Sequence, residues 1–186
     1  MLFRSDVIRR IRNSVSCKVE VGGGIRSEED VGELFDAGID RLVLGTILVR
    51  EPNTVAGWVR RYGQRFVGDI AALDGIVRIK GWESDTGLTD ESLATRIKAI
   101  GIEIVIYTNI SQDGTLSGPD IEGTNRIAER SGLSVILSGG ISSNADVETV
   151  HQNKHPGVAG IITGKAVLEG RVALGDLILR FQLPED

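Results

Sequence analysis

Residues 23–31 read Gly-Gly-Ile-Arg-Ser-Glu-Glu-Asp-Val, and residues 139–147 repeat this pattern as Gly-Gly-Ile-Ser-Ser-Asn-Ala-Asp-Val. The two stretches agree at both glycines, at the isoleucine, at the second serine position, at the aspartate and at the valine. Self-similarity of this kind indicates two copies of one supersecondary unit. We expect these copies to span residues 17–63 and 134–182 of a single domain, residues 1–186.

Each copy contains the parts of a phosphate-binding site. A Gly-Gly pair at the end of a strand lets the backbone approach an anion closely, and the following helix presents its N-terminus to the same place. One unit later, a second strand-like run ends in glycine and a polar residue. The sequence therefore predicts a ligand with a phosphate at each end. The predicted phosphate-binding residues are Gly23, Gly24, Gly45, Thr46, Ser138, Gly139, Gly140, Gly164 and Lys165.

Outward from these stretches, short β-branched runs alternate with amphipathic segments. The expected strands are residues 17–21, 41–44, 64–72, 104–108, 134–137 and 160–163. The expected helices are residues 7–15, 27–37, 53–62, 90–99, 121–130, 145–150 and 173–181. Asp74-Gly75 predicts a hairpin turn into residues 76–80. Alternation through short loops predicts an α/β fold with a parallel sheet inside helices, a partial TIM-type (β/α) barrel of about six βα units.

Composition excludes several classes of function. A net charge of −5 argues against a nucleic-acid or membrane-surface binder, because such proteins need a basic face. No apolar run approaches the ~20 residues that a membrane span requires. Cys17 is the only cysteine and lies in a strand-like apolar run, so no internal disulfide can form and we expect a cytoplasmic setting.

Four motifs resemble one enzyme family. They are Val-Gly-Gly-Gly-Ile-Arg-Ser at 21–27, Lys-Gly-Trp at 80–82, Tyr-Thr-Asn-Ile-Ser-Gln-Asp-Gly-Thr-Leu-Ser-Gly-Pro at 107–119 and Ser-Gly-Gly-Ile at 138–141. Together they resemble the phosphoribosylformimino-5-aminoimidazole carboxamide ribotide isomerases of histidine biosynthesis, over nearly the whole chain. The glycine loops alone would fit the cyclase of the same pathway, but Lys-Gly-Trp after a hairpin favours the isomerase.

The resemblance implies an Amadori rearrangement of a bisphosphorylated aminoaldose into an aminoketose. In this family an acid protonates the ring oxygen and a base moves a proton from C2, without a metal or an organic cofactor. Thr108 and Asp113 match the family's active-site threonine and loop aspartate. Trp82 matches an aromatic residue that stacks on the substrate, with a core position as the alternative. Arg26 is a further candidate phosphate partner, or a solvated residue of a first helical turn.

The catalytic carboxylates are where the sequence departs from the family. The family barrel has eight strands, and the sequence matches neither its first two βα units nor the catalytic aspartate of its first strand. Alignment of Asp74-Gly75 and Gly81-Trp82 with the family places Ala71 at the position of the second catalytic aspartate. Asp69 lies on the same side of the strand, roughly 6–7 Å deeper, and is the candidate substitute. Its alternative is a charge paired inside an incomplete barrel.

Closure by eight strands removes sheet edges, so six strands leave two of them open. We therefore expect a homo-oligomer that covers these edges. Three functions stay open from the sequence: an isomerase, a non-catalytic barrel fragment that still binds phosphate ligands, and a cyclase-type barrel with a glutaminase partner. A second activity on the related anthranilate substrate, which some relatives combine with the first, also stays open.

Overall fold

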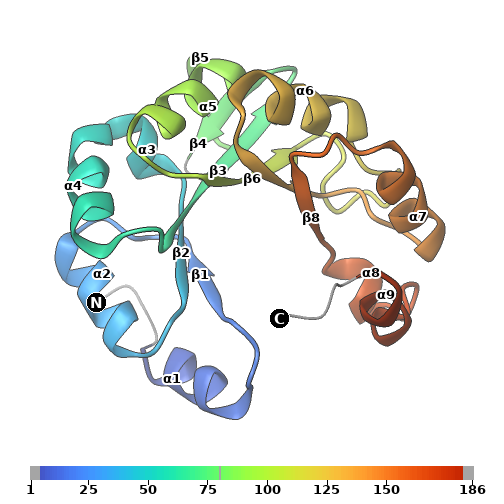
Figure 1. Cartoon of the computed structure of the whole chain (residues 1–186), viewed down its shortest axis with the longest axis horizontal. Helices are drawn as coiled ribbons and strands as arrows, with labels where there is room; N and C mark the ends of the chain where they lie inside the picture. The colour runs from blue at the N-terminus through green and yellow to red at the C-terminus, as the bar shows by residue number, and fades with distance from the viewer. Residues whose placement is uncertain (1–4, 80, 182–186) are drawn as a thin grey trace.

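The computed structural model describes residues 5–79 and 81–181, and its centre is a curled parallel sheet (Figure 1). The strands run in the order β1–β2–β3–β6–β7–β8, and all neighbours in this order are parallel. Their bounds are Glu20–Gly22 (β1), Arg41–Leu44 (β2), Phe66–Leu73 (β3), Ile104–Asn109 (β6), Ser134–Ser138 (β7) and Val158–Ile162 (β8). The predicted partial (β/α) barrel is therefore confirmed.

Helices alternate with these strands, and α2, α4, α5, α6 and α7 cover the outside of the curve (Figure 1). The bounds are Ser5–Ser14 (α1), Glu28–Asp36 (α2), Thr46–Arg50 (α3), Pro52–Tyr62 (α4), Asp90–Ala99 (α5), Ile121–Ser131 (α6), Asn144–Asn153 (α7), Lys165–Leu168 (α8) and Leu174–Phe181 (α9). The largest buried side chains lie between helices and sheet, with Leu42 of β2, Leu93 of α5 and Ile127 of α6 among them. None of the helices in the described ranges has the length and apolar character of a membrane span.

A β-hairpin extends the sheet after β3. The predicted turn is confirmed, because Asp74 and Gly75 both have positive φ, 52° and 75°, and β4 (Ile76–Ile79) returns antiparallel to β3. A further strand, β5 (Ser84–Thr89), pairs antiparallel with β4 and was not predicted. Its sequence, Ser-Asp-Thr-Gly-Leu-Thr, has one large apolar residue, so the hydrophobic pattern gives no signal for it.

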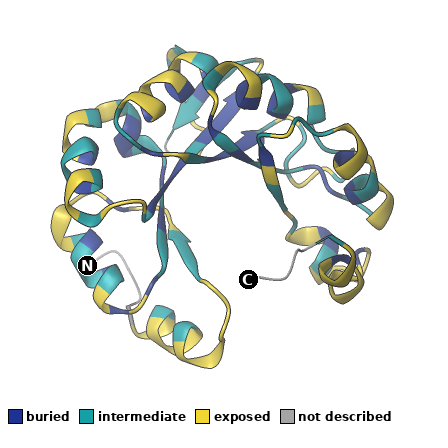
Figure 2. Ribbon diagram, viewed as in Figure 1, coloured by how far each residue is buried: buried dark blue, intermediate teal, exposed yellow. Residues whose placement is uncertain are grey.

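The curled sheet has two open edges. Among the described residues, no strand pairs with the outer edge of β1 or of β8. The predicted helix at residues 7–15 exists as α1, which is largely exposed (Figure 2). Its Ile8 packs against the core, but Val7 and Ile11 are 42% and 50% exposed. The prediction that Cys17 begins a strand is wrong. Cys17 is exposed in a bend, and β1 begins only at Glu20.

Candidate active site

A cavity of about 990 Å³ lies at the carboxyl ends of the parallel strands. The last residues of β1, β2, β7 and β8 line it, and so do residues of β3 and β6 near the ends of those strands. In (β/α) barrels this face carries the active site, because the loops that follow the strands converge there. The cavity therefore marks where the predicted site residues should be sought.

The first predicted phosphate cradle, which we define as Gly23, Gly24, Gly45 and Thr46, lines this cavity. Gly23 and Gly24 have φ values of 91° and 74°, which residues other than glycine rarely adopt. No hydrogen bond within the described part of the chain uses the N–H groups of Gly23, Gly24 or Gly45. Free backbone donors grouped in this way are suited to bind an anion.

The second predicted cradle, Ser138, Gly139, Gly140, Gly164 and Lys165, has nearly the same backbone conformation. Gly139 and Gly140 have φ values of 91° and 82°, and Gly164 (φ −121°, ψ −76°) matches Gly45 (φ −116°, ψ −90°). The helices that follow the glycine pairs both begin with a capping box, Ser27 with Asp30 and Ser143 with Asp146. The sequence repeat is thus also a repeat of local structure.

The loop at residues 110–119 lies over the second cradle. Gly118 donates its N–H to the carbonyl oxygen of Gly140 at 3.1 Å, and Lys165 Nζ donates to the carbonyl oxygen of Gly114 at 3.0 Å. The contact is so close that a Cβ at Gly140 would lie 2.1 Å from the carbonyl oxygen of Gly118. Of this cradle, only Ser138 lines the cavity.

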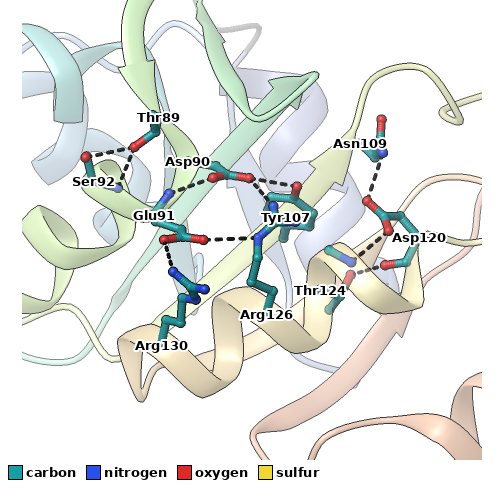
Figure 3. Close-up of polar contacts among 11 residues, drawn as sticks. Thr89, Asp90, Glu91, Ser92, Tyr107, Asn109, Asp120, Thr124, Arg126 and Arg130 are labelled. Carbon is teal, nitrogen blue, oxygen red and sulfur yellow. Dashed lines mark hydrogen bonds and ion pairs between the residues drawn. The ribbon is translucent and has the colours of Figure 1, made fainter.

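Asp113 belongs to this loop and lies at the second cradle, where a Cβ at Gly139 would be 3.2 Å from its Oδ1. It is not among the described residues that line the cavity. The two ends of the loop are joined, because Asn109 Nδ2 donates to Asp120 Oδ2 at 2.8 Å (Figure 3). Asp120 also caps α6 by accepting the N–H of Gly123, so the base of the loop is fixed to that helix.

Asp69 lines the cavity and lies against the first cradle. A Cβ at Gly45 would be 3.2 Å from Asp69 Oδ2. Asp69 makes no hydrogen bond or ion pair with any described residue, which contradicts the alternative that it is a paired charge. Burial raises the pKa of Asp69 to about 6. The carboxyl group is therefore able to exchange a proton near neutral pH.

Three further predicted residues line the same cavity. Thr108 is 6% exposed and is paired across the sheet with Ala71. Trp82 is 42% exposed and lines the cavity, so the alternative of a core tryptophan is wrong. Arg26 also lines it and is exposed. Lys80 of the Lys-Gly-Trp motif lies outside the described residues.

A buried polar network supports the loops from behind the sheet (Figure 3). Asp90, 3% exposed at the start of α5, accepts hydrogen bonds from Tyr107 Oη at 3.0 Å and from Arg126 at 2.8 Å. Its N–H donates to the carbonyl oxygen of Gly75, at the hairpin turn. Burial and the neighbouring Asp90 raise the pKa of Tyr107 above its usual value. Asp90 thus joins the hairpin, β6 and α6, and no local sequence motif predicts this role.

We expect Asp90→Ala to lower the free energy of unfolding by about 2–4 kcal/mol, because the change leaves the buried Tyr107 hydroxyl without its acceptor and removes one of the two carboxylate partners of Arg126. Urea unfolding measures this loss. The matched control is the neighbouring Glu91→Gln, whose ion pairs with Arg126 and Arg130 are partly exposed and contribute about 0–1 kcal/mol. Equal losses in both variants would contradict the central place of Asp90 in the network.

The described residues include no group of histidine, cysteine, aspartate and glutamate side chains arranged to hold a metal ion. The site consists of backbone donors, carboxyl groups, guanidinium groups, a threonine hydroxyl and an aromatic ring. Such groups are equipped for anion binding and for proton transfer.

Comparison with known proteins agrees with this arrangement. Residues 3–173 match the family described as histidine biosynthesis protein. The chain is 39% identical over 174 residues to the 1-(5-phosphoribosyl)-5-((5-phosphoribosylamino)methylideneamino) imidazole-4-carboxamide isomerase of Desulfitobacterium hafniense (strain Y51), covering 92% of this chain and 70% of that protein. Proteins of the same name from Desulforamulus reducens and Bacillus subtilis (strain 168) are 40% and 39% identical, over 92% and 91% of this chain and 70% and 69% of theirs. The chain belongs to the histidine biosynthesis protein family.

Proposed function

We propose that this protein is an isomerase of histidine biosynthesis. It would open the ribose ring of a bisphosphorylated aminoimidazole carboxamide ribotide and convert the aminoaldose to an aminoketose. The relatives are named as isomerases of an imidazole-4-carboxamide that has two phosphoribosyl groups. The observation that carries the proposal is the cavity that brings the first cradle, Asp69, Thr108 and Trp82 together. This favours the isomerase over the cyclase-type barrel.

In this proposal each cradle binds one phosphate of the substrate. The first cradle lies open to the cavity, and the N–H groups of Gly23, Gly24 and Gly45 can donate directly. At the second cradle the loop at residues 110–119 must first shift, because it covers Gly139 and Gly140. Lys165 would then exchange the carbonyl oxygen of Gly114 for a phosphate oxygen. Arg26 would add a positive charge beside the first phosphate.

Proton transfer is assigned to carboxyl groups. Asp69, with its pKa of about 6, acts as the acid that protonates the ring oxygen as the C1–O bond breaks. Asp113 takes the proton from C2 when its loop leaves the second cradle, and the resulting enolamine tautomerises to the ketone. Thr108, opposite Ala71 in the sheet, positions the ribose that opens. Trp82 stacks on the imidazole. No metal or organic cofactor takes part in this scheme.

A turnover assay with the bisphosphorylated aminoaldose tests the proposal. Formation of the aminoketose by the wild type, abolished in Asp113→Asn, supports the isomerase. Tight binding of the bisphosphate without turnover would instead support the non-catalytic barrel fragment. The same assay with the anthranilate analogue decides whether a second activity is present.

We also propose that the protein works in the cytoplasm as a homo-oligomer that covers the open edges of β1 and β8. Exposed apolar side chains lie near both edges: Ile11 of α1 is 50% exposed, and Leu179 of α9 is 86% exposed. Unpaired strand edges favour association of this kind.

Sedimentation velocity at micromolar concentration is expected to give a mass of at least twice the 20.0 kDa of one chain. Ile11→Glu should shift the distribution toward the monomer, because a charge on α1 opposes burial of that face. Glu129→Gln, on the outer helix α6, serves as the control and should leave the mass unchanged. A well-behaved monomer of the wild type would refute the oligomer.

A further inference from the structure

Arg78 lies on β4, in the hairpin that follows β3, and lines the cavity. Val77 of β4 pairs with Ala72 of β3, so Arg78 lies beside Ala71, and both residues line the cavity. In the order of the sheet, β3 and β6 lie between the strands of the first cradle and those of the second. A ligand that spans both cradles must therefore pass this position.

The guanidinium of Arg78 has unused hydrogen-bonding capacity. Its one ion-pair partner among the described residues is Asp85 on β5, 3.2 Å from Nη2. The Asp85 side chain is 51% exposed, so this pair is weak and can be exchanged for a better acceptor at little cost. The Nε atom is enclosed and has no acceptor within the described residues. Buried donors without acceptors are uncommon in native proteins and suggest a ligand.

The surroundings of Arg78 differ from those of the other cavity arginines. Arg26 and Arg50 also line the cavity, but both are exposed and lie close in sequence to the first cradle. The Arg78 side chain is only 26% exposed. Trp82, in the turn between β4 and β5, has a strained φ of 74° and lines the same cavity.

We infer that Arg78 binds the middle of the substrate, donating from its guanidinium to the carboxamide oxygen of the imidazole while Trp82 stacks on the ring. This inference rests on the proposed function and adds a specificity-determining residue to it. The planar donor recognises the carboxamide oxygen, whereas the cradles recognise the phosphates without reading the heterocycle. Arg78 is therefore expected to discriminate the carboxamide substrate from a ligand that has phosphates alone.

Titration calorimetry and steady-state kinetics test this with Arg78→Met, Arg78→Lys and the control Asp85→Asn. Arg78→Met should raise Kd and KM for the bisphosphorylated carboxamide by about 10–100-fold and leave kcat within about threefold. Affinity for inorganic phosphate should stay unchanged, because the cradles are intact. Arg78→Lys should recover part of the loss, and Asp85→Asn should bind like the wild type.

Unchanged Kd in Arg78→Met would overturn the inference, as would an equal loss in Asp85→Asn, because the hairpin ion pair would then be the cause. An equal loss of inorganic phosphate binding would also overturn it. The proposed function fails separately: a wild type that binds inorganic phosphate but not the bisphosphorylated carboxamide would refute the isomerase itself. Circular dichroism of each variant verifies that the fold is retained.

Discussion

Asp69→Asn is expected to lower kcat by about 10²–10⁴-fold, because the change removes the proton donor and keeps the size of the side chain. Binding of inorganic phosphate at the first cradle should persist, since its donors are backbone N–H groups. The control is Asp74→Asn in the exposed hairpin turn five residues later, where asparagine accepts the positive φ of 52°. A variant at Asp69 that turns over substrate at the wild-type rate would remove this residue from the mechanism.

The pH dependence of turnover follows from the same group. An acid must be protonated to act, so kcat should fall as pH rises through the pKa of Asp69, at about 6. This limb should be absent from whatever activity Asp69→Asn retains. A limb of the opposite sign, with kcat rising through the same pH, would assign Asp69 the role of base.

The raised pKa of Asp69 also makes stability depend on pH, and stability should fall as pH rises, as kcat does. An unfolded aspartate loses its proton near pH 4, whereas folded Asp69 keeps it up to about pH 6. The folded state therefore binds more protons than the unfolded state between these values, and stability falls as pH rises through this window. At pH 8 we expect Asp69→Asn to be more stable than the wild type by about 1–3 kcal/mol in urea unfolding, with the difference vanishing near pH 4. A variant less stable at pH 8 would contradict this sign.

Gly140→Ala is expected to destabilise the protein by about 3–5 kcal/mol and to abolish binding at the second cradle. The added Cβ would lie 2.1 Å from the carbonyl oxygen of Gly118 and 3.0 Å from Cα of Pro119, so backbone atoms of the loop must move. Gly170→Ala is the matched control. Its φ of 68° gives similar backbone strain, but no atom lies within 4 Å, so we expect a loss of only about 1–2 kcal/mol.

Urea unfolding and phosphate titration of the two glycine variants separate contact from strain. If both variants lost the same stability, backbone strain alone would explain the loss, and the close contact between Gly140 and the loop would contribute nothing to stability. If Gly140→Ala bound the bisphosphate normally, the second cradle would not be a phosphate site.

The repeat could be predicted from sequence because its structure is local. Ser27 with Asp30, and Ser143 with Asp146, form the same capping box wherever the flanking glycine pair ends a strand. The six parallel strands were likewise found from β-branched runs. The strand β5 could not be found this way, because pairing with β4 rather than an apolar pattern holds it in place.

The parts of the site that the sequence did not predict depend on tertiary contacts. That Asp69 lies against Gly45 follows from the register of β2 and β3, where Leu44 is paired with Gly68. The contact between Gly118 and Gly140, and the one that Lys165 makes with the loop, join segments far apart in the chain. Periodicity and local motifs do not record such contacts.

Titration calorimetry of the wild type with the bisphosphorylated aminoaldose tests the two-cradle site most directly. We expect one ligand per chain, bound at least about 10²-fold more tightly than inorganic phosphate, because both phosphates of one molecule engage at once. Affinity no greater than that of inorganic phosphate, or two ligands bound independently to each chain, would contradict a single site that spans Gly23-Gly24 and Gly139-Gly140.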